Sequence, residues 1–299
     1  MAEPEAVLTV PRPGVSWQRQ IWLSRLRQLP LPPLIILVGF LFLAIFAPLL
    51  TSHSPTDVAL TSRLKPPSWY EGGSSDLLLG TDKLGRDLLT RIIFGARVTF
   101  IVAILSLVVG AAIGAAIGII SGYMGGRTDA ILMRVVDAAL AFPTILIALL
   151  LAVTLGPSFG TVIIAIALVL WARFARIVRG EVLSLKKRDF VALAMLSGAS
   201  HIRVMLVHIL PNVMNTLLVL TTLNVGYAII MEATLSFLGA GIPPPTPSWG
   251  QMVSEGREYI GSAWWLSLAP GTAIAMVVLG FNLLGDWLRD ALDPRLRQL

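Results

Sequence analysis

The segment Asp189-Phe-Val-Ala-Leu-Ala-Met-Leu-Ser-Gly-Ala-Ser-His-Ile-Arg-Val-Met-Leu-Val-His-Ile-Leu-Pro-Asn212 lies between two long apolar stretches. The basic residues that precede it are Arg173, Arg176, Arg179, Lys186, Lys187 and Arg188. Phe190, Leu193 and Ala194 recur at helical spacing and form one apolar face. Gly198 suits a helix end, where a left-handed residue is common. The segment therefore predicts two short helices joined by a turn, on the basic side of a membrane protein.

The composition indicates an all-α membrane protein. The 299 residues are 56% hydrophobic and only 13% charged, and the mean hydropathy is +0.80. Soluble domains carry about 25% charged residues, whereas a membrane-spanning helix needs roughly 17–25 apolar residues. The candidate spans are Leu31–Leu50, Val98–Gly126, Ala138–Leu155, Ser158–Ala172, Ile209–Met231 and Tyr259–Gly285. We therefore expect six transmembrane helices, of which the fourth is short for a span and has Pro157 and Arg173 close to its ends.

The distribution of basic residues predicts the orientation. The net charge is +6 and the pI is near 10.2, a value that also suits nucleic-acid binding. With six spans and a cytoplasmic N-terminus, however, 16 of the 23 basic residues fall in inside segments. This bias is typical of cytoplasmic loops of membrane proteins. We therefore expect both termini to be cytoplasmic, in a multi-pass protein of the cell membrane that does not bind nucleic acid.

Three parts of the chain follow from this topology. Residues 1–30 form a cytoplasmic tail, in which 16–29 are either an amphipathic interfacial helix or a charged flank of the first span. Residues 31–294 form the membrane domain, including a cytoplasmic loop at 175–211. Residues 295–299 are a short cytoplasmic tail. On the outer side, a long loop at 53–97 is expected to end in a helix capped by Thr81 or Asp82. Aromatic residues at the outer interface are expected to be Trp249, Trp264 and Trp265.

Four glycines occur at intervals of four residues in the second span. They are Gly110, Gly114, Gly118 and Gly122. Four residues are slightly more than one helical turn, so the glycines form a stripe that lets another helix approach closely. We interpret the stripe as a packing surface, with a place along a substrate pathway as the weaker alternative.

Enzymatic chemistry is not evident in this sequence. It contains no cysteine and no Gly-x4-Gly-Lys-Ser/Thr motif for binding nucleotide phosphates. His53, His201 and His208 lie in different segments without the spacing of a metal site. We therefore expect no catalytic, cofactor-binding or metal-binding residues in this chain.

Three separated segments resemble the C-type permease subunits of dipeptide, oligopeptide and nickel ABC importers. They are Leu79-Gly-Thr-Asp82 with Gly85-Arg-Asp87 and Gly95-Ala-Arg97, the loop 189–212, and Leu235-Ser-Phe-Leu-Gly239 with Pro247-Ser-Trp-Gly250. The resemblance covers roughly residues 32–294 and implies a type I ABC importer permease fold. It further implies a homologous B-type permease, two ATPase subunits that use ATP and Mg²⁺, and an extracytoplasmic substrate-binding protein. Short peptides are the implied substrate, transported by alternating access.

In this family the loop 189–212 couples the permease to the ATPase. The implied contact residues are Asp189, Phe190, Val191, Ala192, Leu193, Ala194, Gly198, Ala199, Ser200 and Arg203. The sequence departs from the family pattern Glu-Ala-Ala, because these positions hold Ala192, Leu193 and Ala194. An ion pair from the missing glutamate is therefore excluded, and docking rests on shape, apolar contact and the charges of Asp189 or Arg203.

Several alternatives remain open at this point. The substrate of such a permease is alternatively a nickel chelate or a glutathione-like ligand, and the loop is alternatively an ordinary amphipathic helix. A protein of another class, a stand-alone secondary transporter or channel, would carry charged residues at mid-span and inverted repeats. A membrane-embedded enzyme would need a catalytic set that the sequence does not display.

Overall fold

The computed structural model describes residues 30–292, in which the regular elements are helical apart from one isolated β-bridge between Thr81 and Asp87. The elements are α2 (Leu31–Leu50), η1 (Leu60–Ser62), α3 (Leu88–Met124), α4 (Gly126–Ala141), α5 (Thr144–Leu155), α6 (Phe159–Leu185), α7 (Asp189–Leu196), α8 (His201–Arg203), η2 (Val204–Ile209), α9 (Leu210–Phe237), α10 (Trp249–Arg257) and α11 (Trp265–Leu292). The all-α expectation is confirmed. The predicted amphipathic segment 16–29 and the tail 295–299 lie outside the described residues.

Five helices within residues 30–292 are long and apolar enough to cross a membrane. They are α2, α3, α6, the continuous helix from α8 through η2 to α9, and α11. The predicted span at 138–155 differs, because α4 and α5 meet at an angle of 87°. Pro143 explains the break: it disfavours helical backbone at Phe142, which is extended (φ −82°, ψ 143°). Six spans are reached only when this bent pair is counted as one.

Two helix boundaries differ from the sequence-based expectations. The helix α3 begins at Leu88, and its cap is Asp87 rather than Thr81 or Asp82: the Asp87 carboxylate accepts a hydrogen bond of 2.9 Å from the Thr90 amide. The helix α6 runs to Leu185, so the expected cytoplasmic loop starts after this residue rather than at 175. The arginines between residues 173 and 179 therefore lie on a helix and not in a loop.

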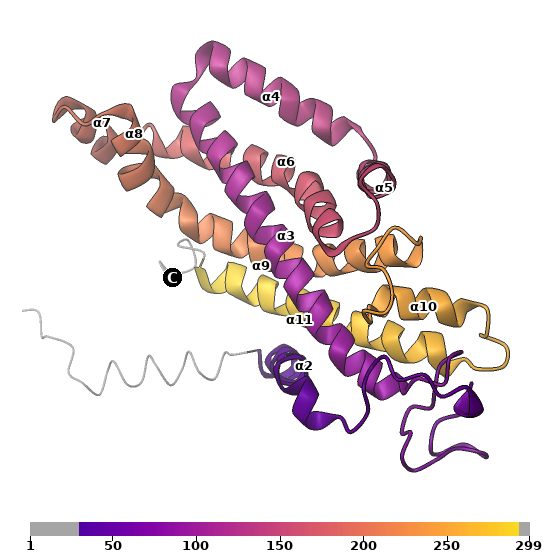
Figure 1. Cartoon of the computed structure of the whole chain (residues 1–299). Helices are drawn as coiled ribbons and strands as arrows, with labels where there is room; N and C mark the ends of the chain where they lie inside the picture. Colours follow the sequence, from indigo (N-terminus) through magenta and orange to yellow (C-terminus); the bar gives the residue numbers. More distant parts are fainter. Residues whose placement is uncertain (1–29, 293–299) are drawn as a thin grey trace, which may run out of the picture.

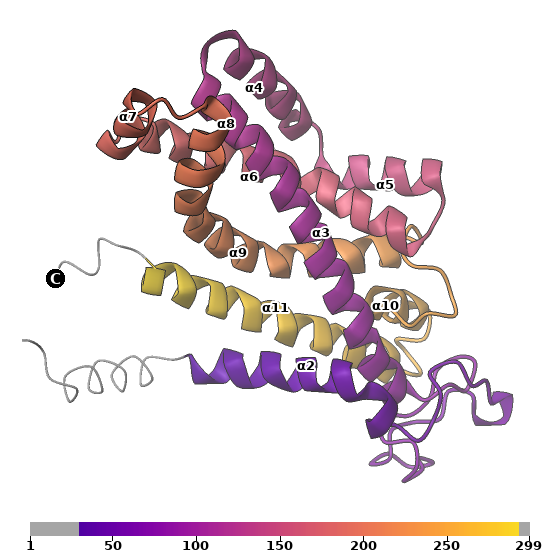
Figure 2. The same ribbon diagram turned by 60° about the vertical axis from the view of Figure 1, so that its left-hand side comes forward.

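The long helix α3 organises the molecule. It packs along α6 and also contacts α2 and α9, and it extends from the α7–α8 region to the irregular segment 51–87 at the opposite end (Figure 1). The beginning of α2 and the end of α11 lie at the same end of the bundle as α7 (Figure 2). The bundle thus separates the helical segment after α6 from the long loop before α3.

Candidate functional site

The end of α7 is set by Gly198, which has a positive φ of 81°. The Gly198 amide donates to the Met195 carbonyl oxygen at 3.0 Å, and the Ala199 amide donates to the Ala194 carbonyl oxygen at 3.1 Å. This pair of bonds is the Schellman pattern that ends helices at a left-handed glycine. A Cβ added at Gly198 would meet no atom within 4 Å. Backbone conformation, and not crowding within this chain, is therefore what requires glycine here.

The second helix starts at His201 and continues into the membrane. The Ser200 hydroxyl accepts a hydrogen bond from the Arg203 amide at 3.3 Å and so caps α8. We expected a span at Ile209–Met231 separate from the preceding short helix, but α8, η2 and α9 form one continuous helix. Since proline has no N–H, the preceding turn changes its pattern: it is π-helical, and the Leu210 amide donates to the carbonyl of Met205, five residues earlier.

Apolar side chains on α7 and α8 are strongly exposed. The exposed fractions are 61% for Leu193, 85% for Leu196 and 66% for Ile202, and Phe190 is also exposed. We call these four residues the docking surface. Exposed apolar patches of this kind mark interaction sites. The docking surface lies at the end of the molecule opposite the segment 51–87 (Figure 1).

The predicted coupling residues share this region but do not all point outward. The exposed ones are Asp189, Phe190, Ala192, Leu193, Gly198, Ser200 and Arg203. Ala194 and Ala199 are half-buried and pack on the main hydrophobic cluster. Val191 is fully buried in that cluster. Val191 therefore anchors α7 to the rest of the chain instead of belonging to the surface that a partner could contact.

Tyr123 joins the α7–α8 segment to the ends of α3 and α6. Its hydroxyl lies 2.9 Å from Nδ1 of His201 in α8 and 3.9 Å from the sulfur of Met195 in α7. Lys186, directly after α6, donates a hydrogen bond to the Tyr123 carbonyl oxygen, and its ammonium lies 5.5 Å from the ring centroid. The side chain of Tyr123 is buried. One residue thus ties together four helices at this end of the molecule.

The predicted glycine stripe faces α6. A Cβ added at Gly114 would lie 2.5 Å from the Cβ of Phe174 and 2.5 Å from the carbonyl oxygen of Trp171. At Gly118, a Cβ would lie 2.7 Å from the carbonyl oxygen of Ala175. Gly110 and Gly122 contact α6 in the same way. The glycines therefore allow the backbones of α3 and α6 to approach more closely than any other residue type permits.

Two basic residues of α6 hold α4 in place. The Arg179 guanidinium donates two hydrogen bonds of 2.6 Å to the two carboxylate oxygens of Asp129. Arg176 pairs with Asp137. Bidentate arginine–carboxylate pairs fix orientation as well as distance. These contacts position the bent α4–α5 pair against α6.

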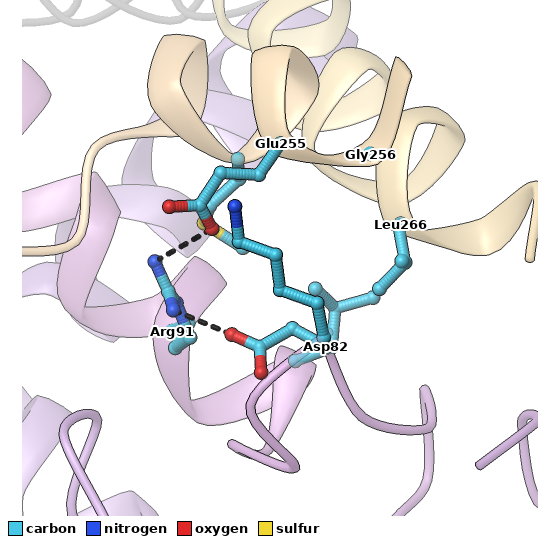
Figure 3. Close-up of a pocket in the computed structure, with 8 residues that line it drawn as sticks. Asp82, Arg91, Glu255, Gly256 and Leu266 are labelled. Atoms are coloured by element: carbon cyan, nitrogen blue, oxygen red, sulfur yellow. Dashed lines mark hydrogen bonds and ion pairs between the residues drawn. The ribbon is translucent and has the colours of Figure 1, made fainter. Parts of the chain in front are cut away.

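At the opposite end, a buried ionic network fixes the segment 51–87. The Asp82 carboxylate accepts from Arg86 Nε and from Arg91 Nη1, both at 2.6 Å. Glu255 of α10 lies 3.7 Å from Arg91 (Figure 3), and it lies 3.2 Å from Arg86. Burial raises the pKa of the Glu255 carboxyl, while the Arg86 guanidinium acts in the opposite direction. The network holds the loop, α3 and α10 together as one unit.

The tryptophans near this end serve packing more than interface anchoring. Trp249 is fully buried, and its indole N–H donates to the Ile92 carbonyl at 2.9 Å. A Cβ at Gly95 would lie 2.7 Å from its ring, so a glycine of α3 makes room for it. Trp265 is also buried, and among the three predicted interface residues only Trp264 is exposed. The expectation of an outer aromatic belt is therefore wrong for Trp249 and Trp265.

Glu232 is a fully buried carboxylate within α9, which continues to Phe237. Its Oε1 accepts hydrogen bonds from the hydroxyls of Ser236 at 2.8 Å and Ser248 at 2.7 Å. Ser248 directly precedes α10. Because a buried carboxylate needs such partners, Glu232 fixes the start of α10 on α9.

Comparison with known proteins identifies the family. A family model described as "Binding-protein-dependent transport system inner membrane component" matches residues 114–298. The chain belongs to this family. It is the permease of an ABC importer, a multi-pass component of the inner membrane, as the resemblance of its motifs predicted. Such a permease is the membrane component of its transport system and not the ATPase.

The permease is similar over most of its length to curated relatives. It is 42% identical over 264 residues to the di/tripeptide transport system permease protein DppC of Pseudomonas aeruginosa, covering 88% of this chain and 87% of the relative. It is 45% identical over 265 residues to the dipeptide transport system permease protein DppC of Escherichia coli K12, covering 89% and 88%.

Solved structures support the fold of the permease. A chain of the MetNI methionine ABC transporter in an inward-facing conformation has a TM-score of 0.56 at 16% identity. The match covers 68% of this permease and 96% of that chain. The shared arrangement is that of an ABC importer permease.

Residues that sequence reasoning did not find are Tyr123, Lys186 and Glu255. The partners of Tyr123 lie 63 to 78 residues further along the chain, and Arg86 is 169 residues from Glu255. Local spacing carries no signal for contacts at such separations.

Proposed function

We propose that this permease forms half of the translocation pathway of an ATP-driven importer of short peptides. The observation that carries the proposal is the docking surface, held by Tyr123 to the ends of α3 and α6. Because the α7–α8 segment is attached rigidly, a partner that binds its apolar surface can move the permease helices together with it. The names of the relatives in Pseudomonas aeruginosa and Escherichia coli support peptides as the cargo.

Four partner chains complete this importer in our proposal. A homologous B-type permease supplies the other half of the pathway, and an apolar groove of about 680 Å³ between α3 and α9 supports a second helical subunit there. Two ATPases bind the docking surfaces of the two permeases and use ATP and Mg²⁺. An extracytoplasmic binding protein delivers the peptide to the end that carries the segment 51–87.

Transport in this proposal follows alternating access. Closure of the ATPase dimer displaces the α7–α8 segment, and Tyr123 transmits this displacement to α3. Because α3 packs along α6 through the glycine stripe, the two helices move as one body. The pathway between the two permeases then opens outward and receives the peptide. Return of the ATPases to their open state releases it inward.

Reconstitution tests the function. The complete complex with its binding protein, placed in proteoliposomes, is expected to accumulate labelled dipeptide only with ATP and Mg²⁺. Uptake of a nickel chelate or glutathione instead of dipeptides would favour the alternative substrates. Uptake by the permease alone, driven by an ion gradient, would contradict the proposal and support a secondary transporter.

Cysteine labelling tests the orientation. The natural chain has no cysteine, so any labelling of a single-cysteine variant comes from the introduced residue. Cysteines in place of the exposed residues Ser75 and Ser184 are the informative pair. In intact cells an impermeant reagent should modify Ser75→Cys and not Ser184→Cys. Modification of Ser184→Cys from outside would place the docking surface on the wrong side of the membrane.

A further inference from the structure

Arg173 is an arginine within a membrane-spanning helix. It lies 14 residues after Phe159, the first residue of α6 at the end away from α7. At 1.5 Å per residue this is about 21 Å along the helix. If the hydrocarbon layer of roughly 30 Å begins at Phe159, Arg173 lies inside it. Arginine at such depth is costly and commonly marks an ion or substrate path.

The arginines that follow on α6 are paired, whereas Arg173 is not paired within residues 30–292. Arg176 and Arg179 bind aspartates of α4. Arg173 has no ion pair or hydrogen bond to the described part of the chain, and it is half-buried. Its N–H groups are therefore available to a ligand, although the side chain has a defined position.

That position is set by an aromatic ring from another helix. The guanidinium carbon of Arg173 lies 4.5 Å from the ring centroid of Tyr227 in α9. The Tyr227 hydroxyl in turn lies 3.2 Å from the hydroxyl of Thr144, the first residue of α5. A guanidinium this close to an aromatic ring gains cation–π attraction and keeps its N–H donors for hydrogen bonds to a ligand. Three helices thus present one cation and two hydroxyls together.

The surface of α9 next to this cluster is polar. Asn224 precedes Tyr227 by three residues, and both are half-buried. Residues three apart lie on one face of a helix. The amide nitrogen of Asn224 donates to the Leu220 carbonyl of its own helix at 2.8 Å, and within residues 30–292 its amide oxygen accepts no hydrogen bond. A polar face in an otherwise apolar helix is suited to a hydrated path.

We propose that Arg173, positioned by Tyr227, binds the carboxylate of the peptide in transit. This inference rests on the proposed function. Every unmodified peptide ends in a carboxylate whatever its side chains, so one guanidinium serves substrates of different sequence. Planar arginine matches a carboxylate through two parallel hydrogen bonds. A single ion pair in a hydrated path also lets the peptide leave again.

The test compares peptide carboxylate with peptide amide in the reconstituted complete importer. Uptake of a dipeptide and of its C-terminal amide is measured at concentrations that load the binding protein equally, together with ATP hydrolysis. The wild type should prefer the carboxylate. Arg173→Gln should lose carboxylate uptake by roughly tenfold or more and should no longer discriminate, since a charged hydrogen-bonding partner is removed. ATP hydrolysis stimulated by the binding protein should persist.

Two further variants sharpen the result. Arg173→Lys keeps the positive charge but cannot form two parallel hydrogen bonds to a carboxylate. It should therefore assemble and retain only part of the preference for the peptide carboxylate over the amide. Arg134→Gln is the control: this exposed arginine of α4 has no ion pair or hydrogen bond within residues 30–292, and the variant should transport as the wild type does. Discrimination unchanged in both Arg173 variants would overturn the inference.

Other outcomes separate this inference from the function itself. In one outcome, Arg173→Gln does not form the two-permease complex, whereas Arg173→Lys assembles and discriminates fully between the peptide carboxylate and the amide. This outcome would show that Arg173 pairs with the second permease, and it would overturn the inference. Absence of peptide uptake by the wild-type importer would overturn the proposed function and this inference with it. Peptide uptake unchanged in Arg173→Gln would overturn the inference alone.

Discussion

Replacing Gly114 by alanine adds one carbon atom at the closest approach of α3 and α6. That atom would lie 2.5 Å from the Cβ of Phe174, 2.5 Å from the carbonyl oxygen of Trp171 and 3.0 Å from the amide nitrogen of Ala175. Two of these are backbone atoms, which cannot rotate away, so the helices must separate. Overpacking of this kind costs about 1–3 kcal/mol. The opposing gain in helix propensity is at most about 1 kcal/mol, so we expect net destabilisation.

The same helix pair offers a matched control. Gly180 lies in α6, and a Cβ added there would meet no atom within 4 Å. Gly180→Ala should therefore be neutral or stabilising by about 0.4–1 kcal/mol. The assay is the thermal unfolding midpoint of the purified complex in detergent, together with its yield from membranes. Gly114→Ala should lower both quantities, and Gly114→Leu should lower them further. If Gly114→Ala were as stable as Gly180→Ala, close packing of α3 on α6 would be refuted.

Three further predictions concern the two ends of the molecule. Gly198→Val should lower ATP-driven uptake without loss of the complex, because left-handed backbone costs roughly 1–2 kcal/mol in a residue with a side chain. Gly198→Asn should lower uptake less, since asparagine tolerates positive φ better. If both variants lowered uptake equally, the positive φ of Gly198 would not be the cause. Tyr123→Phe removes the hydrogen bond with His201 and should reduce the amount of peptide transported per ATP hydrolysed by roughly two- to tenfold. If this ratio were unchanged, the movement of α7 and α8 would not reach α3 through Tyr123. Burial raises the pKa of Glu255 above its ordinary 4.5, so the folded state holds this proton to higher pH than the unfolded chain does. The contribution of Glu255 to the free energy of unfolding should then fall as pH rises from 4.5 through the raised pKa. In Glu255→Gln the thermal unfolding midpoint should depend less on pH over this range. If the midpoint of the variant kept the pH dependence of the wild type, Glu255 would not be its source.

Structural features that are determined by residues close together in the chain could be predicted from the sequence. The helix end at Gly198 follows from residue type and position, and the start of α8 follows from Ser200. The spacing of the glycines placed them on one face of α3. In each case the physical determinant lies within a few residues, so a pattern in the sequence is sufficient to describe it.

Features that depend on distant residues were not accessible. The span at 138–155 was expected to be one helix, whereas α4 and α5 meet at 87°. The helix α4 pairs with α6 through Asp129 and Asp137, whose partners lie 50 and 39 residues further along the chain. The sequence could not distinguish Trp249, which packs into the core, from Trp264, which remains exposed, because both look like interface residues. Val191 was predicted to be a contact residue for the ATPase because its neighbours in α7 are. Its burial depends on which face of a short helix the remaining chain covers.

The unbroken length of α3 constrains how this family of chains can change in evolution. Arg91 near one end is locked to Asp82 and Glu255, and Tyr123 near the other end contacts His201. An insertion of one residue between them would turn one end against the other by about 100° and lengthen the helix by about 1.5 Å. Either the ionic network or the contact with α8 would then be lost. Between these two anchors only changes of about seven residues, close to two full turns, preserve the phase.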